Sequence, residues 1–227
     1  DSLCLRPACR ATPFSHTQEI SHPDYYSIDL PAQHLTAEMT GTSRSAIFRF
    51  TSHRAGKVYI IVNPNSNMGE GFVAVDTVHR CIYGYNPVRR IYQGWGRKAG
   101  FNGWFVVVFH NPIHEFGVDG SVAWVAFDVQ NQQQIKVKAA SSFVSWQGAC
   151  HNLSVEIPRW NFEEIRSHTQ KLWLKYLSHV YIQTSNNRSS LSLFYTSLYH
   201  TGFLPRVFSD VDGRYPSFAS GDSIMHN

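Results

Sequence analysis

Between about residue 25 and about residue 144, the chain reads as a series of short segments with strand-like patterns of hydrophobic and polar positions. Residues 25–30 and 46–50 alternate with a period of two, whereas residues 58–62 form a continuous apolar run. Similar short segments follow at 71–75, 104–109, 122–127 and 135–137. Clusters of Gly, Pro and Asn separate them at intervals of roughly 10 residues, and no helical period competes. This pattern predicts a β-sandwich and argues against alternating strand–helix units.

The pattern changes after Pro158, where apolar residues begin to recur every three or four positions. Asn161 is placed to cap a helix, and Glu164 follows three residues later, as in a capping box. We therefore predict an amphipathic helix of about five turns that ends near residue 180. A second helix is predicted from about residue 190 to residue 200, with Gly202 and Pro205 ending it.

Composition narrows the choice of partners. Hydrophobic residues make up 43% of the 227 residues and charged residues 16%, so the chain can bury a sizeable core. The net charge is +4 and no basic run exceeds Arg89-Arg90, which argues against nucleic acid or an anionic membrane as a partner. No apolar stretch approaches the length of a membrane-spanning helix.

Cysteines and sequons point to the secretory route. The spacing of the cysteines matches no zinc motif. Their number is even, which favours disulfide pairing. Asn152 and Asn187 stand in Asn-x-Ser sequons, which are candidate glycosylation sites. The four cysteines are Cys4, Cys9, Cys81 and Cys150. We expect a secreted, extracellular protein with one or two disulfides.

Candidate carboxylates occur in two places. Glu163 and Glu164 lie in the first turn of the predicted helix, where acidic side chains are favoured by the helix dipole alone. A second acidic pair lies in a loop-like segment after the second helix, and its members and neighbours could hold sugar hydroxyls or simply form a turn. This segment contains Asp210, Asp212, Gly213, Arg214 and Tyr215.

Metal and nucleophile motifs are weak. The loop does not fit a calcium-binding EF-hand, since Tyr215 stands where that motif needs Gly. His110 and His114 are spaced like zinc ligands on a helix, but Pro112 between them prevents that helix. No Ser or Cys nucleophile motif is present, so the residues alone give no convincing catalytic set.

Several segments resemble glycoside hydrolase family 92, the calcium-dependent exo-acting α-mannosidases. They occur in the family's order and cover nearly the whole chain. The segments are FSHTQEISHPDYYSI at 14–28, GYNPVRRIYQG at 84–94, AGFNGWF at 99–105, SFVS at 142–145, FYTSLYH at 194–200 and VFSDVDGRY at 207–215. The last two are the most specific, whereas Trp146-Gln147-Gly148 replaces a common Val-Glu-Gln and the tail from Ser217 to Asn227 departs from the family.

The resemblance implies an N-terminal β-sandwich (supersandwich), a helical linker and the first helix of an (α/α)₆ barrel. It further implies inversion at the anomeric carbon by a Glu acid and an Asp base, a calcium ion, and a mannose-containing glycan as substrate. These carboxylates and most calcium ligands are expected beyond Tyr215, in a barrel domain of the same polypeptide, so the chain is expected to be a fragment. Only the residues of the segment 210–215 carry over, as a lining of the cleft.

We therefore predict a mainly β chain with a sandwich at 1–156, a helical linker at 157–183 and the beginning of an incomplete barrel at 184–227. The predicted function is to scaffold the cleft of an inverting α-mannosidase, with α-1,2 linkages as the expected target. The chain itself is expected to lack the acid and base. An alternative is a glycan-binding sandwich without catalysis that uses aromatic residues such as Trp95 or Trp104. A structural product without a ligand is the third hypothesis.

Overall fold

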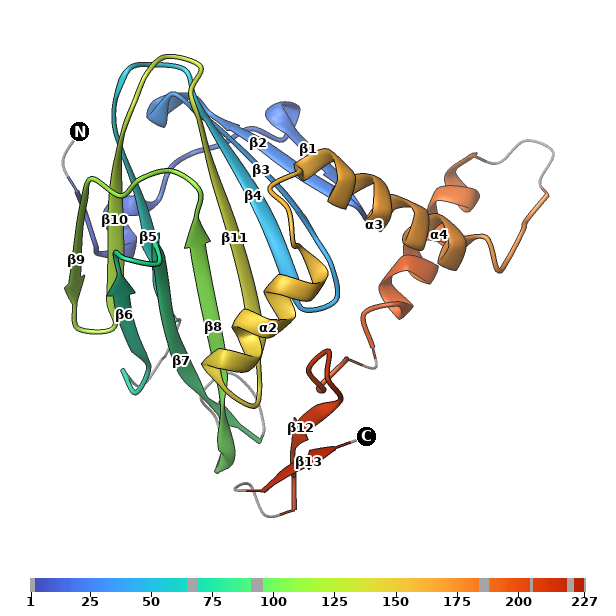
Figure 1. The fold of residues 1–227 in the computed structure, drawn as a ribbon. Helices are drawn as coiled ribbons and strands as arrows, with labels where there is room; N and C mark the ends of the chain where they lie inside the picture. Colours follow the sequence, from blue (N-terminus) through green and yellow to red (C-terminus); the bar gives the residue numbers. More distant parts are fainter. Residues whose placement is uncertain are drawn as a thin grey trace.

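Two stacked antiparallel sheets form the body of the computed structural model, which describes residues 3–64, 69–90, 96–183, 188–204, 206–219 and 223–226 (Figure 1). Within these residues the larger sheet has the strand order β1-β2-β3-β4-β11-β8-β7-β6, and the smaller has the order β5-β10-β9. The larger comprises β1 Glu19–His22, β2 Tyr25–Leu30, β3 Leu35–Gly41, β4 Ser45–Ser52, β11 Gln134–Ser142, β8 Lys98–Phe109, β7 Cys81–Arg89 and β6 Phe72–Asp76. The smaller comprises β5 Gly56–Val62, β10 Val122–Val129 and β9 Glu115–Asp119.

The two faces of the larger sheet bury different clusters because side chains alternate along each strand. On β4, Phe48 and Phe50 pack towards the smaller sheet, whereas Ile47 packs on the opposite side. The space between the sheets is filled mainly by aliphatic and aromatic residues such as Phe109 and Phe127. This arrangement confirms the predicted sandwich.

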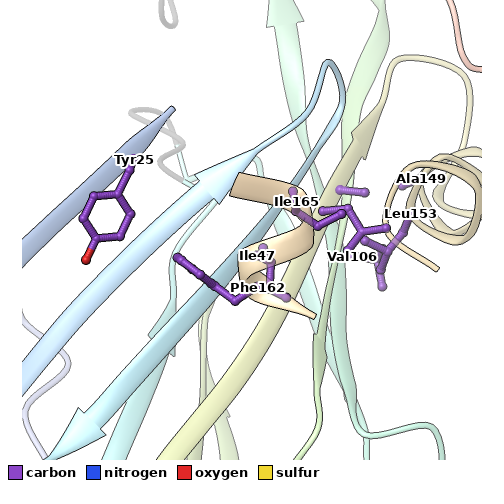
Figure 2. Close-up of a cluster of buried hydrophobic side chains, with 9 residues drawn as sticks. Tyr25, Ile47, Val106, Ala149, Leu153, Phe162 and Ile165 are labelled. Atoms are coloured by element: carbon purple, nitrogen blue, oxygen red, sulfur yellow. The ribbon is translucent and has the colours of Figure 1, made fainter. Parts of the chain in front are cut away.

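Helices cover the outer face of the larger sheet (Figure 1). The helices and 3₁₀ turns are α1 Pro7–Arg10, η1 His16–Gln18, η2 Pro31–Gln33, α2 Trp146–Glu156, α3 Phe162–Leu177 and α4 Arg188–Thr201. Ala149 and Leu153 of helix α2, and Phe162 and Ile165 of helix α3, meet sheet residues in one buried cluster (Figure 2). Ile157, directly after α2, belongs to the same cluster. Burial of this apolar face fixes α2 and α3 on the sheet.

Charged side chains fasten α3 to strands β2, β3 and β4 of the larger sheet. The Arg49 guanidinium pairs with Glu38 at 2.6 Å and with Glu163 at 3.0 Å. Arg166 lies 3.7 Å above the ring of Tyr25, in cation–π geometry. Burial alone would raise the pKa of Glu38, but the hydrogen bonds from Arg49 and Tyr25 outweigh burial and lower it. Glu163 thus has a structural role, as predicted, although through an ion pair to the sheet that the dipole argument did not foresee.

Lys138 of β11 holds the end of α2. Its side chain is buried, the ammonium donates to the Ile157 carbonyl at 2.7 Å, and it lies 4.4 Å from the ring of Trp160. Burial lowers the pKa of Lys138, because the charged form loses hydration. This contact fixes the C-terminal end of α2 at the level of Lys138.

The last long helix, α4, packs on α3 and not on the sheet. Trp173 contacts Tyr199 with ring centroids 4.7 Å apart, and the Tyr195 hydroxyl donates to the Val180 carbonyl at 3.0 Å. No described residue of α4 is fully buried, and Leu193 remains 71% exposed. The predicted second helix is confirmed, and it packs against α3 on one of its faces.

The sequence patterns missed several elements. Helix α2 lies inside the segment assigned to the sandwich, and β1, β3, β7 and β9 were not predicted. A short hairpin, β12 Arg214–Pro216 with β13 Ile224–His226, follows α4. Cys4 and Cys9 form a disulfide with Cα atoms 6.2 Å apart, whereas Cys81 and Cys150 are free thiols. One disulfide of the predicted one or two is therefore present.

Candidate functional site

Asp210 anchors the segment that the sequence singled out. Its side chain is only 2% exposed, and both carboxylate oxygens point into the protein. Ser142 Oγ donates to Oδ2 at 2.8 Å, and Asn152 Nδ2 donates to Oδ1 at 2.8 Å. Because hydrogen bonds to a buried charge are the strong ones, this carboxylate ties the loop to β11 and α2. The sugar-binding role predicted for Asp210 does not fit this burial.

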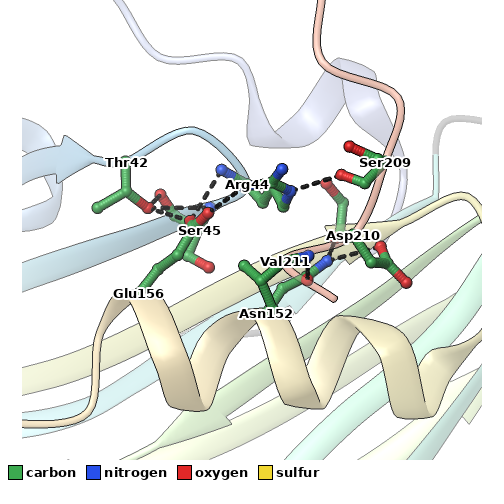
Figure 3. Close-up of polar contacts among 9 residues, drawn as sticks. Thr42, Arg44, Ser45, Asn152, Glu156, Ser209, Asp210 and Val211 are labelled. Carbon is green, nitrogen blue, oxygen red and sulfur yellow. Dashed lines mark hydrogen bonds and ion pairs between the residues drawn. The ribbon is translucent and has the colours of Figure 1, made fainter. Parts of the chain in front are cut away.

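Asn152 makes a second contact with the same loop, which we call the anchored loop, residues 208–216, and Arg44 makes a further one (Figure 3). Asn152 Oδ1 accepts from the Val211 backbone N–H at 2.9 Å, so its amide bonds the loop at two points. Arg44 donates through Nε to the Ser209 carbonyl at 2.6 Å and pairs through Nη1 with Glu156 at 2.8 Å. Residues from the turn between β3 and β4, from α2 and from the loop thus form one polar network around the start of the loop.

Gly148 makes room for this network. A Cβ at this position would lie 2.3 Å from Asp210 Oδ2 and 2.7 Å from Ser142 Oγ. Side-chain atoms essentially never approach so closely, so any other residue would displace the carboxylate. Glycine at position 148 of α2 therefore allows the anchored loop to lie close against the helix.

The tip of the loop is a tight turn with a more exposed surface. Gly213 has a φ of 85°, a conformation that favours glycine, and its N–H donates to the Asp210 carbonyl at 3.0 Å. Arg214 donates through Nε to Asp212 at 2.8 Å, and its side chain is 39% exposed. Partial burial alone would raise the pKa of Asp212, but the hydrogen bonds from Arg214 outweigh burial and lower it. Tyr215 is half-buried and pairs with Met225 in the terminal hairpin.

Aromatic stacking supports the loop from the other side. The rings of Phe143 and Phe208 are stacked with centroids 4.6 Å apart, and Phe218 contacts Phe208 edge-on at 5.0 Å. Phe101 of β8 meets both Phe143 and Phe218. The anchored loop is therefore packed as well as hydrogen-bonded, so the exposed surface around Arg214 has a fixed position.

The glycosylation expected at Asn152 is not compatible with this fold. The residue is fully buried, and its Nδ2, the atom that would carry the glycan, donates to Asp210 and to the Ser141 carbonyl. The second predicted site, Asn187, lies outside the described residues. Asn152 therefore has a structural role in the fold and is not a glycosylation site.

The remaining candidates fall into structural roles. His114 pairs with Asp128 on the surface, and His110 packs edge-on against Trp160. The Asn161 side chain accepts from the Glu164 N–H, which is the predicted helix cap. Trp104 is half-buried against Tyr85, with ring centroids 4.8 Å apart. Trp95 lies outside the described residues.

The part of the chain that the structure describes offers no cluster of three or more His, Cys, Asp or Glu side chains that could hold a metal ion. Asp210 bonds inward and Asp212 pairs with Arg214, so the anchored loop does not fit a calcium site. Within the same residues, no helix has the length and apolar character needed to cross a membrane.

Family comparisons agree with this architecture. The chain matches the glycosyl hydrolase family 92 N-terminal domain over residues 4–142 and the family 92 catalytic domain over residues 148–227. Together these matches cover nearly the whole sequence, so the chain belongs to glycoside hydrolase family 92. No curated protein matches it.

Solved structures of family 92 proteins share the fold. The inverting mannosidase BT2199 from Bacteroides thetaiotaomicron VPI-5482 is 24% identical with a TM-score of 0.87, over 100% of this chain and 32% of that one. The α-mannosidase BT3965 from Bacteroides thetaiotaomicron is 25% identical with a TM-score of 0.79, over 95% and 31% respectively. The family 92 glycosyl hydrolase ccman5 is 21% identical with a TM-score of 0.75. The chain spans about a third of the length of these structures.

Sequence reasoning found the anchored loop but not its partners. Ser142 and Gly148 were noted only as parts of segments compared with the family, Glu156 was not singled out, and Arg44 lies far away along the chain. One available signal was Ser145, a helix cap whose Oγ accepts from the Gly148 N–H at 3.0 Å and which marks the start of α2.

Proposed function

We propose that the chain forms the β-sandwich and the adjoining start of the catalytic domain in an inverting α-mannosidase that acts on mannose-containing glycans. The observation that carries this proposal is the pair of consecutive family 92 matches, over residues 4–142 and 148–227. Two of the similar solved structures are described as α-mannosidases or inverting mannosidases. We further propose α-1,2-linked mannose as the target.

The role of this part is to position the anchored loop. Inverting hydrolysis needs an acid and a base about 6.5–9.5 Å apart, with a water between them. Asp210 and Asp212 are already bonded to protein groups, so we assign both to structure and not to proton transfer. The acid, the base and the calcium ligands would then come from the remainder of the natural polypeptide, in its helical barrel.

Within the loop, we assign sugar contact to the residues that stay accessible. Arg214 presents guanidinium N–H groups beside the Asp212 carboxylate, and Tyr215 stands next to them. Guanidinium and carboxylate groups together offer the donors and acceptors that sugar hydroxyls need. Gly213 contributes through the shape of the turn.

Secretion is part of the proposal. The Cys4–Cys9 disulfide supports an oxidising compartment, because such bonds persist mainly outside the cytosol. We therefore propose that the enzyme is extracellular and acts on glycans outside the cell.

A titration of the chain with α-1,2-linked mannobiose, followed by ligand-observed NMR, tests the sugar-contact role. We expect weak, saturable binding that Arg214→Ala reduces several-fold, whereas the exposed Arg206→Ala leaves it unchanged. Equal binding by both variants, or no binding at all, would contradict the assignment. Loss of binding in Trp104→Ala alone would instead favour the aromatic glycan-binding alternative.

A further inference from the structure

Two free thiols lie between β7 and α2, away from the anchored loop. Cys81 and Cys150 are both half-buried and pack against the same hydrophobic cluster beneath the helices. Cys81 shares one face of β7 with Tyr83, two residues on, and Cys150 shares one face of α2 with Trp146, four residues earlier. The rings of Tyr83 and Trp146 are 5.4 Å apart, so these two faces meet.

The strand register brings the cysteines to the same level. Cys81 pairs with Val108 of β8, and Val108 pairs with Lys138 of β11. Lys138 holds the C-terminal end of α2 through the Ile157 carbonyl, whereas the start of α2 lies over Ser142 at the end of β11. Helix α2 therefore runs opposite to β7, from the level of Tyr83 towards that of Cys81.

The spacings agree with this alignment. Two residues along a strand advance about 6.6 Å, and four along a helix advance about 6 Å. With Tyr83 placed against Trp146, one step along each element puts Cys81 beside Cys150. The two thiols also interact electrostatically. Burial, then Asp76 and then Cys150 raise the pKa of Cys81 to about 11.

We propose that Cys81 and Cys150 form a second disulfide, which joins β7 to α2 when the chain is exposed to a disulfide oxidant. The thiolate of one cysteine attacks an oxidant such as oxidised glutathione and displaces one glutathione thiolate. The other cysteine then attacks this mixed disulfide and releases the second glutathione. The pair loses two protons and two electrons, and the oxidant is reduced to two thiols.

This bond would reinforce the helix that holds the anchored loop. Gly148, Asn152 and Glu156, which surround or bond the loop, all belong to α2. A covalent link at Cys150 fastens this helix to the sheet at the centre of these contacts. The raised thiol pKa values make exchange slow at neutral pH, so a catalyst or long exposure is needed.

The test is disulfide mapping of the whole chain after equilibration in a buffer of reduced and oxidised glutathione. Free thiols are alkylated in denaturant, and the chain is cut with trypsin without reduction. Cleavage after Arg and Lys, except before Pro, places Cys81 in peptide 81–89, Cys150 in 139–159, and Cys4 with Cys9 in 1–10. We expect 81–89 linked to 139–159, two hydrogen masses below the sum, and loss of this species on reduction.

Alkylation of both Cys81 and Cys150, or their linkage to Cys4 or Cys9, would overturn the proposal. In Cys150→Ser, the peptide with Cys81 must be alkylated. Oxidised wild-type chain should also unfold about 5 °C above its reduced form, a difference that the Cys150→Ser variant loses in large part. The Cys4–Cys9 disulfide is present in both chains, so any difference that remains in this variant measures its contribution.

Discussion

The amide of Asn152 bonds Asp210 and its neighbour at once, donating to Asp210 Oδ1 at 2.8 Å and accepting from the Val211 N–H at 2.9 Å. These residues are 58 and 59 positions apart in the sequence. A helix on the sandwich thereby fixes a loop that follows both later helices. The loop's position is consequently a property of the sandwich, which is the physical basis for assigning a scaffolding role to this chain.

Removal of the Asp210 carboxylate should release the anchored loop. Asp210→Ala leaves the Ser142 hydroxyl and one N–H of the Asn152 amide without an acceptor, so we expect the free energy of unfolding to fall by about 3 kcal/mol. Urea denaturation measures this change. The matched control is Asp212→Ala, whose partner Arg214 is partly exposed, and there the loss should stay below about 1 kcal/mol. Equal losses would contradict the anchoring role.

Gly148→Ala should destabilise the chain against the trend of helix propensity. Alanine normally stabilises a helix by about 1 kcal/mol relative to glycine. Here the new Cβ would meet Asp210 Oδ2 at 2.3 Å, so we expect a net loss of about 2 kcal/mol. At Gly103 a Cβ would meet its nearest neighbours at 3.6–3.8 Å, and Gly103→Ala should be nearly neutral. A stabilised Gly148→Ala variant would show that the loop is not seated as described.

Glu38 should make the attachment of α3 depend on pH. The hydrogen bonds from Arg49 and Tyr25 outweigh burial and lower the pKa of Glu38 below its ordinary value of 4.5. This stabilisation is therefore full above about pH 4.5 and is lost as pH falls through the folded-state value. Unfolding midpoints measured from pH 6 to pH 3 should fall more steeply in wild type than in Glu38→Gln.

Glu164→Gln is the control for this pH profile, because it changes an exposed carboxylate at the start of the same helix. Its profile should follow that of wild type. A Glu38→Gln profile as steep as wild type would mean that the Glu38–Arg49 pair contributes nothing to the acid sensitivity of the fold.

Local patterns were sufficient for most of the sandwich and for two helices. Strand β4 and helix α4 each have an apolar face with the period of their element, and both were predicted. Strand β7 was missed because it contains Gly84, Asn86 and Pro87, which usually mark turns. Gly84 is needed there because a Cβ would lie 2.1 Å from the Phe72 carbonyl, and Pro87 stands at a register shift.

Helix α2 was missed because it buries small and polar residues. Gly148, Ala149 and Asn152 face the protein interior, so the helix has no wide apolar stripe. The same cause hid the role of Asn152, which looked like a surface sequon. Its partner, Asp210, is buried by residues distant in the sequence, and no local pattern can reveal such burial. The family resemblance did not supply it either, since it implied that Asp210 lines the cleft.

The central proposal is that this chain positions the sugar-binding side of a family 92 α-mannosidase without supplying the acid and the base. The most direct measurement is mannose release from α-1,2-linked mannobiose by this chain, first with calcium and then with a chelator. The account predicts no release under either condition, because both carboxylates of the anchored loop are bonded to protein groups. Release that requires calcium would place the catalytic carboxylates within this chain and would contradict the account.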